Sequence, residues 1–67
     1  MSIVKVIEVI ASSEKNFEDA IQKAVNEASK TIKNIDSVYV EHFKCHVHDG
    51  KVSTYGVNCK ISFRVDR

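Results

Sequence analysis

The stretch Tyr55–Val65 reads Tyr-Gly-Val-Asn-Cys-Lys-Ile-Ser-Phe-Arg-Val, with an apolar residue at every second position. Strict alternation over such a length predicts a β-strand. Because side chains alternate across a strand, we expect one face to carry Val57, Cys59, Ile61, Phe63 and Val65. The other face then carries Thr54, Gly56, Asn58, Lys60, Ser62 and Arg64. The first face should be buried under a helix, and function should be sought on the second.

The residues before this strand predict one further strand and one helix. Ser2–Ala11 is rich in Val and Ile, which favours a strand. After a polar break, Asn16 is a good helix N-cap. The apolar positions from Phe17 to Ile32 then recur at spacings of three and four, which predicts an amphipathic helix of four to five turns. Asn34 is the expected left-handed stop after it.

A hairpin completes the predicted fold. Ser37–His48 reads as a strand, and Asp49-Gly50 is a strong two-residue turn signal. With that turn as centre, pairing without interruption sets Val40 opposite Cys59, Val38 opposite Ile61, Val47 opposite Val52, Cys45 opposite Thr54 and Phe43 opposite Gly56. The predicted fold class is α+β: a β-α-β-β chain whose three-stranded antiparallel sheet wraps around one helix, in a single domain over residues 1–67.

This register predicts self-association. Val38 and Val40 should share the helix-covered face, whereas the opposite face should carry Tyr39, Phe43, Cys45, Val47 and Val52. That second face is too apolar for one helix to hide, and an exposed apolar patch usually marks an association surface. A chain of 67 residues also buries only roughly 60% of its unfolded surface, so oligomerisation would add needed stability.

Composition argues against several classes of protein. The net charge is +1 and the ten Lys and Arg residues are scattered, whereas nucleic-acid binding favours a concentrated basic face. No apolar run has the length of a membrane span and no signal-peptide pattern opens the chain, so we expect no membrane partner and a cytoplasmic location. No nucleophile, base and orienting group converge from their spacing, so an enzyme is not the expected class.

Two sets of side chains are candidates for chemistry. In the predicted register Cys45 and Cys59 lie on opposite sheet faces, which argues against a disulfide or a redox pair; Cys59 is then a core residue and Cys45 an interface residue. His42, His46 and His48 share one strand face, and His46 with His48 could chelate a divalent metal. Two imidazoles are too few for a structural zinc site, and solvated hairpin histidines are the simpler interpretation.

The order and spacing of several segments resemble the dodecin family along essentially the whole chain. The matching segments are Val4–Ile10 with Ser12-Ser13, Phe17–Ala20, Ile35-Asp36, Thr54-Tyr55 and Ser62–Val65. The resemblance implies β-α-β-β protomers assembled into a hollow homododecamer. It also implies that flavins (riboflavin, FMN or FAD) bind in stacked pairs between subunits, for storage or sequestration.

Two positions depart from that family pattern. Flavin-binding members carry a stacking Trp where this chain has Ser37, and a flavin-binding Gln where it has Gly56. Loss of one stacking aromatic costs on the order of 1–3 kcal/mol. The candidate ligand-binding residues are therefore Ser37 and Gly56, with Tyr39 on the same face as a partial replacement for the missing ring.

Two hypotheses follow from these observations. In the first, the chain binds and stores a flavin or another small planar ligand. In the second, the assembly persists but has lost flavin, and it holds a divalent metal, another ligand or nothing.

Overall fold

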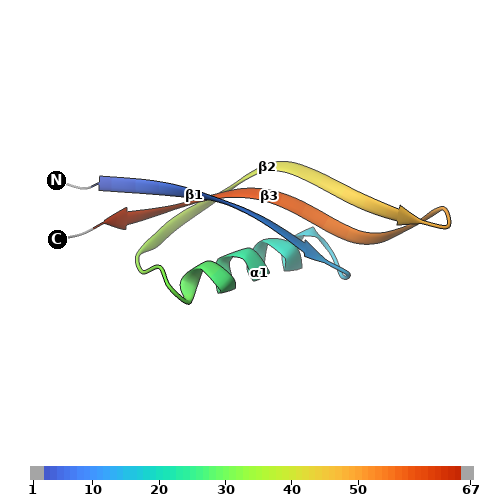
Figure 1. The fold of residues 1–67 in the computed structure, drawn as a ribbon, viewed down its shortest axis with the longest axis horizontal. Helices are drawn as coiled ribbons and strands as arrows, with labels where there is room; N and C mark the ends of the chain where they lie inside the picture. Colours follow the sequence, from blue (N-terminus) through green and yellow to red (C-terminus); the bar gives the residue numbers. More distant parts are fainter. Residues whose placement is uncertain (1–2, 66–67) are drawn as a thin grey trace.

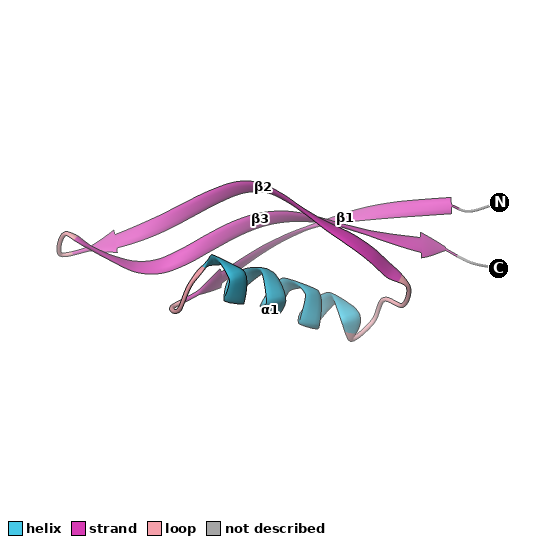
Figure 2. Cartoon of the chain, turned by 180° about the vertical axis from the view of Figure 1, so that it is seen from behind, coloured by secondary structure: helices cyan, strands magenta, loops and turns pink. Residues whose placement is uncertain are grey.

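The computed structural model describes residues 3–65 and consists of one helix on one face of a three-stranded sheet (Figures 1 and 2). The elements follow in the order β1 (Ile3–Ser13), α1 (Phe17–Ser29), β2 (Ile35–His48) and β3 (Lys51–Val65). The strand order is β1-β3-β2, and both pairings are antiparallel. The predicted fold class is confirmed, and the alternating stretch Tyr55–Val65 forms most of the central strand.

Helix α1 begins as the sequence predicts and ends earlier. The Asn16 side chain accepts a hydrogen bond of 2.7 Å from the backbone N–H of Asp19, which makes Asn16 the N-cap. The helix stops at Ser29, so its 13 residues form fewer turns than predicted. Asn34 does adopt a left-handed conformation, with φ of 64°. The polar residues after Ser29 form a connection in which Thr31 and Ile32 donate backbone hydrogen bonds to the carbonyl of Ala28.

The core is small and lies between α1 and the sheet. Its buried side chains are Ala20, Ala24, Ala28, Val57, Cys59 and Ile61. Alanines on the helix let its backbone approach the strands closely. Val38 and Val40 pack against this cluster as predicted, whereas Phe63 and Val65 were predicted to be buried and are only partly so. Burial raises the pKa of the Cys59 thiol above its ordinary value.

The hairpin register differs from the predicted one in its middle section. Asp49 and Gly50 both have positive φ, as a two-residue turn of this kind requires, and Val47 lies opposite Val52. The register then shifts by one, because β3 carries Ser53 as an extra residue. It shifts back where β2 carries Glu41 as an extra residue, so Val40 lies opposite Cys59 as predicted. These two β-bulges offset each other.

Between the two bulges the predicted faces were wrong. Phe43 lies opposite Val57 and Cys45 opposite Tyr55, so both residues lie on the helix side of the sheet. Phe43 there meets the ring of Phe17 edge-on, with centroids 5.0 Å apart. Cys45 and Cys59 therefore share a face, contrary to the prediction. Both are free thiols. Cys45 lies opposite Tyr55, and Tyr55 is four residues, roughly 13 Å, from Cys59 along β3, which is too far for a disulfide.

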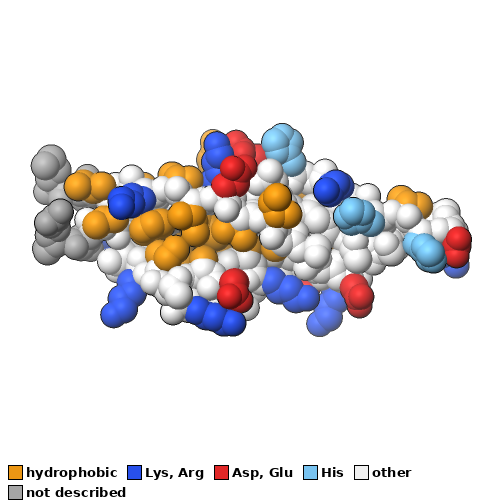
Figure 3. Space-filling view, viewed as in Figure 1, with side chains coloured by type: hydrophobic (Ala, Val, Ile, Leu, Met, Phe, Trp, Pro, Cys, Tyr) orange, Lys and Arg blue, Asp and Glu red, His pale blue; other side chains and the backbone are white. Residues whose placement is uncertain are grey.

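The hairpin extends beyond the helix and beyond the end of β1, which pairs as far as Tyr55, and we call residues 46–53 the hairpin arm (Figures 1 and 2). Every residue of the arm is exposed in the single chain. The radius of gyration is 13.8 Å, against about 11 Å for a compact chain of this length. On the face seen in Figure 3, hydrophobic side chains gather away from the arm, and the histidines are spread from the middle of the molecule to the hairpin tip. No helix in the described part of the chain is long and apolar enough to span a membrane.

Candidate functional site

The face of the sheet away from α1 is uncovered, and we call it the open face. It is built of rows in which one residue of β3 is flanked by one residue of β1 and one of β2. From the chain ends toward the arm, the rows are Val6–Ser62–Ser37, Glu8–Lys60–Tyr39, Ile10–Asn58–His42 and Ser12–Gly56–Lys44. Ile10 is 75% exposed and Tyr39 is 72% exposed, so large apolar surfaces face outward here.

Two shallow hollows lie on the open face. The Ser37 hollow, of about 210 Å³, is lined by Val6, Ser37, Tyr39, Lys60 and Ser62. The Gly56 hollow, of about 200 Å³, is lined by Ile10, His42, Lys44, Gly56, Val57 and Asn58. Each is smaller than the roughly 300–1,000 Å³ of a typical small-molecule pocket. A second surface would be needed to enclose a ligand of ordinary size.

The candidate residues Ser37 and Tyr39 line the Ser37 hollow together. The hydroxyls of Ser37 and Ser62 are hydrogen-bonded across the strands, 2.5 Å apart. The ring of Tyr39 lies one row further along, opposite Lys60. This hollow thus combines an aromatic ring with hydroxyl groups, and a planar polar ligand can stack on the one and hydrogen-bond to the other.

Gly56, the third candidate, lies in the other hollow. It was predicted to face Phe43, but its partner is Lys44, because the bulge at Ser53 moves the register by one. Gly56 is buried, and a Cβ added to it would lie 3.9 Å from Lys44 Cε. Gly56 and Ser37 share the open face, but six residues of β3, roughly 20 Å, separate Gly56 from the row of Ser37. One chain does not bring these two candidates together.

A charged row separates the two hollows. Lys60 Nζ lies 3.3 Å from Glu41 Oε2, and Glu8 is paired with Lys60 from the β1 side. Glu41 is the extra residue of a bulge, which turns its carboxylate toward Lys60 on the open face. The row therefore places one lysine and two carboxylates at the centre of the open face.

The histidines do not form a metal site in the described structure. His42 and His46 pair with Asn58 and Thr54, so both lie on the open face. His48 lies two residues after His46 on β2, whose alternation is unbroken there, so the three histidines share one face as predicted; His48 Nε2 also lies 3.4 Å from Asp49 Oδ2. Residues 3–65 contain no group of three His, Cys, Asp or Glu side chains arranged to hold a metal ion.

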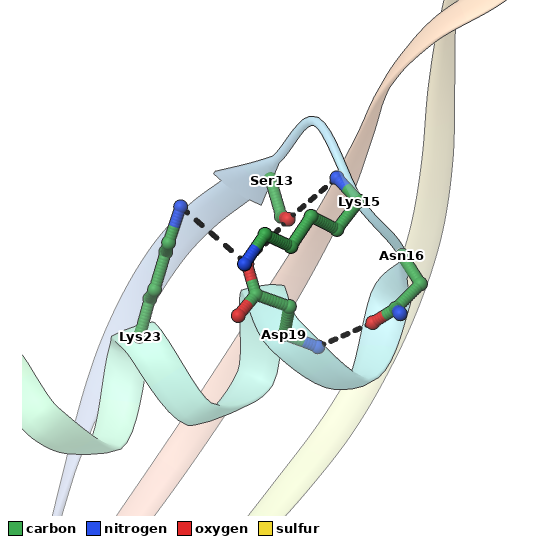
Figure 4. A network of polar contacts seen from close by, with 5 residues as sticks. All are labelled: Ser13, Lys15, Asn16, Asp19 and Lys23. Atoms are coloured by element: carbon green, nitrogen blue, oxygen red, sulfur yellow. Dashed lines mark hydrogen bonds and ion pairs between the residues drawn. The ribbon is translucent and has the colours of Figure 1, made fainter.

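A polar network ties the end of β1 to the start of α1 (Figure 4). Ser13 is 3% exposed, and its Oγ donates to Asp19 Oδ2 at 2.6 Å and accepts from the backbone N–H of Lys15 at 2.9 Å. Lys23 Nζ lies 3.4 Å from the same carboxylate oxygen. The hydrogen bond from Ser13 is the main cause that lowers the pKa of Asp19. We assign this network to the fold, since it lies away from both hollows.

The sequence did not single out Asn58, whose side chain lines the Gly56 hollow. Its Oδ1 is buried and has no hydrogen-bond partner. The alternation in Tyr55–Val65 put Asn58 in the polar row, but one polar residue among six gave no reason to prefer it. The sequence did not predict the register between the bulges, which sets His42 opposite Asn58.

Comparisons with known proteins agree with this architecture. The family model described as Dodecin matches residues 3–66. The dodecin of Thermus thermophilus is 30% identical over 64 residues, covering 96% of this chain and 93% of the relative. A solved variant of a Thermus thermophilus dodecin has a TM-score of 0.94 at 28% identity, with all of both chains covered. The calcium dodecin of Mycobacterium tuberculosis, described as having a novel calcium-binding site, has a TM-score of 0.82 at 29% identity, covering 96% of this chain and 91% of that one.

The chain belongs to the dodecin family. The resemblance in the residue pattern is thereby confirmed, and with it the class of small-ligand-binding protein.

Proposed function

We propose that this chain is the subunit of a hollow homododecamer that binds and stores a small planar ligand of the flavin type on its open face. The observation that carries the proposal is the open face itself, which holds two hollows and exposed apolar side chains that the chain's own helix does not cover. The role is binding rather than catalysis, and the partners are further copies of the chain and a small molecule.

The hairpin arm supports self-assembly. Its two strands extend past α1 with no third element against them, and an isolated two-stranded hairpin is marginally stable in water. Val47 is 65% exposed and Val52 is 49% exposed, so contact with another copy would bury apolar surface and stabilise the arm. An assembly would also supply the second surface that each hollow needs to enclose a ligand.

The Ser37 hollow supports a planar ligand. The exposed ring of Tyr39 offers a stacking surface, and the hydroxyls of Ser37 and Ser62 offer hydrogen bonds. A phenol at position 39 is a smaller stacking surface than an indole at position 37, and Gly56 offers no side chain. We therefore expect flavin binding to be weak.

A divalent cation is the alternative cargo, favoured by the calcium dodecin among the similar structures. The described residues offer no preformed three-ligand group within one chain. A cation site would have to combine side chains such as His46 and His48 from more than one subunit.

The cytoplasm is the proposed location. Cys45 is an exposed free thiol, which suits a reducing compartment.

The test is a flavin titration of the wild type and of the double variant Ser37→Trp with Gly56→Gln, followed by quenching of flavin fluorescence. Native mass spectrometry should first give the dodecamer mass for both proteins. The double variant should bind riboflavin at least about fivefold more tightly, since one stacking aromatic contributes on the order of 1–3 kcal/mol. A Cβ at position 56 meets its nearest atom, the Lys44 carbonyl oxygen, at 3.5 Å, which is an ordinary van der Waals contact. The Cβ of the introduced Gln therefore fits without a clash.

Ser29→Trp is the matched control, because it adds an indole at an exposed helix end away from the open face. It should leave riboflavin affinity unchanged. Equal affinity of the wild type and the double variant would show that positions 37 and 56 do not form the site. Small molecules released from the purified protein and identified by mass spectrometry would name the natural ligand.

A further inference from the structure

Asn58 has an unmet hydrogen-bonding requirement at the edge of the Gly56 hollow. Its Oδ1 is buried without a partner, and a buried acceptor left unpaired costs roughly 1–3 kcal/mol. Most buried polar atoms in folded proteins are hydrogen-bonded, so an exception calls for an explanation. Nothing in the Ser37 hollow shows a comparable defect, since its hydroxyls bond to each other.

The surroundings of Asn58 suit an incoming ligand better than an internal partner. Its neighbours in the row are Ile10, which has no polar side-chain atom, and His42, which is exposed. The next row contains Gly56, whose missing side chain leaves the hollow above it open. A flat ligand lying over Gly56 would therefore meet the amide of Asn58 at its edge and the apolar surface of Ile10 beside it.

The amide defines the chemistry of the ligand edge. It carries one acceptor and two donors side by side, and its terminal torsion is soft, so the group can turn to present its oxygen to the hollow. A ligand with an N–H next to a carbonyl can form two hydrogen bonds with it at once. The N–H donates to Oδ1, and the ligand carbonyl accepts from Nδ2.

We propose that Asn58 determines ligand specificity in the Gly56 hollow by pairing with the N–H and carbonyl of a cyclic imide or lactam on a planar heteroaromatic ligand. This inference rests on the proposed function and names the group that would recognise such a ligand in this chain. Asn58 does so from a position two residues along the strand from Gly56.

The experiment compares two probes that differ only in the donor: lumiflavin, which has the imide N–H, and 3-methyllumiflavin, in which a methyl group replaces that hydrogen. The assembled wild type should bind lumiflavin roughly three- to tenfold more tightly, the factor that one net hydrogen bond supplies. Asn58→Leu removes donor and acceptor at similar volume, so it should bind both probes equally. Asn26→Leu makes the same change on the exposed side of α1 and should keep the wild-type preference.

Thermal stability gives a second readout that separates recognition from a structural role. Asn58→Leu removes an unpaired buried oxygen, so its melting temperature should rise, on the order of 5 °C. A lower melting temperature together with a retained preference for lumiflavin would overturn the inference. Equal wild-type affinity for the two probes would also overturn it while leaving the proposed function standing. Failure of the assembled wild type to bind either probe would overturn the proposed function as well.

Discussion

The helix-packed half of the sheet and the hairpin arm are parts of the same two strands, yet they are held in different ways. In the helix-packed half, Val57, Cys59 and Ile61 are buried against the alanines of α1. In the arm, residues 46–53 are all exposed. The first region owes its order to burial within one chain. The second has backbone pairing and a tight turn, and its apolar side chains remain in contact with water.

This difference also explains how strictly each register is determined. A slip of one residue beside the core would turn every buried side chain outward, so burial fixes that pairing. In the arm no buried face opposes a shift, and the bulge at Ser53 is accommodated there. The register also shifts at Asp36 and Glu41, but Val38 and Val40 between them keep their places against the core. Pairing in the arm is therefore not fixed by burial within the chain.

The largest expected effect is the loss of a core side chain in the helix-packed half. Ile61 is fully buried, and Ile→Ala in such a site costs about 2–5 kcal/mol, a large share of a small domain's stability. Ile61→Ala should lower the midpoint of urea unfolding far more than Val47→Ala in the arm, both measured at low protein concentration. Equal midpoints would mean that the two regions do not differ in this way.

An intermediate effect is expected from a charge in the arm. Val47→Asp places a carboxylate at a position that is solvated in the single chain, where such changes cost about 0.5 kcal/mol or less. If a neighbouring copy covers the arm, the same carboxylate becomes buried and unpaired, which costs several kcal/mol. Native mass spectrometry should then show dissociation, with the helical circular dichroism signal retained in the separated subunits.

Gln22→Asp is the control for that variant, since it adds the same charge on the exposed side of α1. It should assemble like the wild type. A Val47→Asp protein of wild-type mass would place the arm outside the subunit contacts.

The smallest expected effect concerns pH and the junction of β1 with α1. The pKa of Asp19 is lowered from its ordinary value of 3.8, chiefly by the hydrogen bond from Ser13. A lowered folded-state pKa contributes stability above the unfolded-state value, and this contribution is lost as pH falls through the folded-state value. The melting temperature of Ser13→Ala should therefore approach that of the wild type below about pH 4. Ser12→Ala, at the exposed neighbour, should run parallel to the wild type at every pH; the same behaviour in Ser13→Ala would contradict the assignment.

The sequence predicted those parts of the molecule whose causes are local or repeated. The alternation in Tyr55–Val65, the Asn16 cap and the Asp49-Gly50 turn each specify a conformation within a few residues, and the structure contains all three. The helix end was misplaced because Ile32 continues the apolar spacing after the helix has ended at Ser29. Nothing in the residues after Ala28 opposes a helix strongly enough to reveal this.

The candidate site could be predicted as a face but not as a set of contacts. Ser37, Tyr39 and Gly56 all lie on the open face, because the bulge at Glu41 restores the alternation beyond it. Pairing of Gly56 with Lys44 depended on Ser53, whose side chain donates to the carbonyl of His46 at 3.2 Å. A single serine carries no sequence signal for a bulge. Likewise, the oxygen of Asn58 is unpaired because neither Ile10 on β1 nor His42 on β2 donates a hydrogen bond to it.

The two bulges have a consequence for the symmetry of any assembly that uses the arm. A bulge bends and twists its strand, so Glu41 and Ser53, one on each strand, set the direction in which the arm leaves the helix-packed half. In a ring or shell, the rotation that relates one subunit to the next must close on itself. Deleting Glu41 or Ser53 would change that rotation while leaving every core contact in place. These two residues, neither of them buried, would then determine how many copies complete a closed particle.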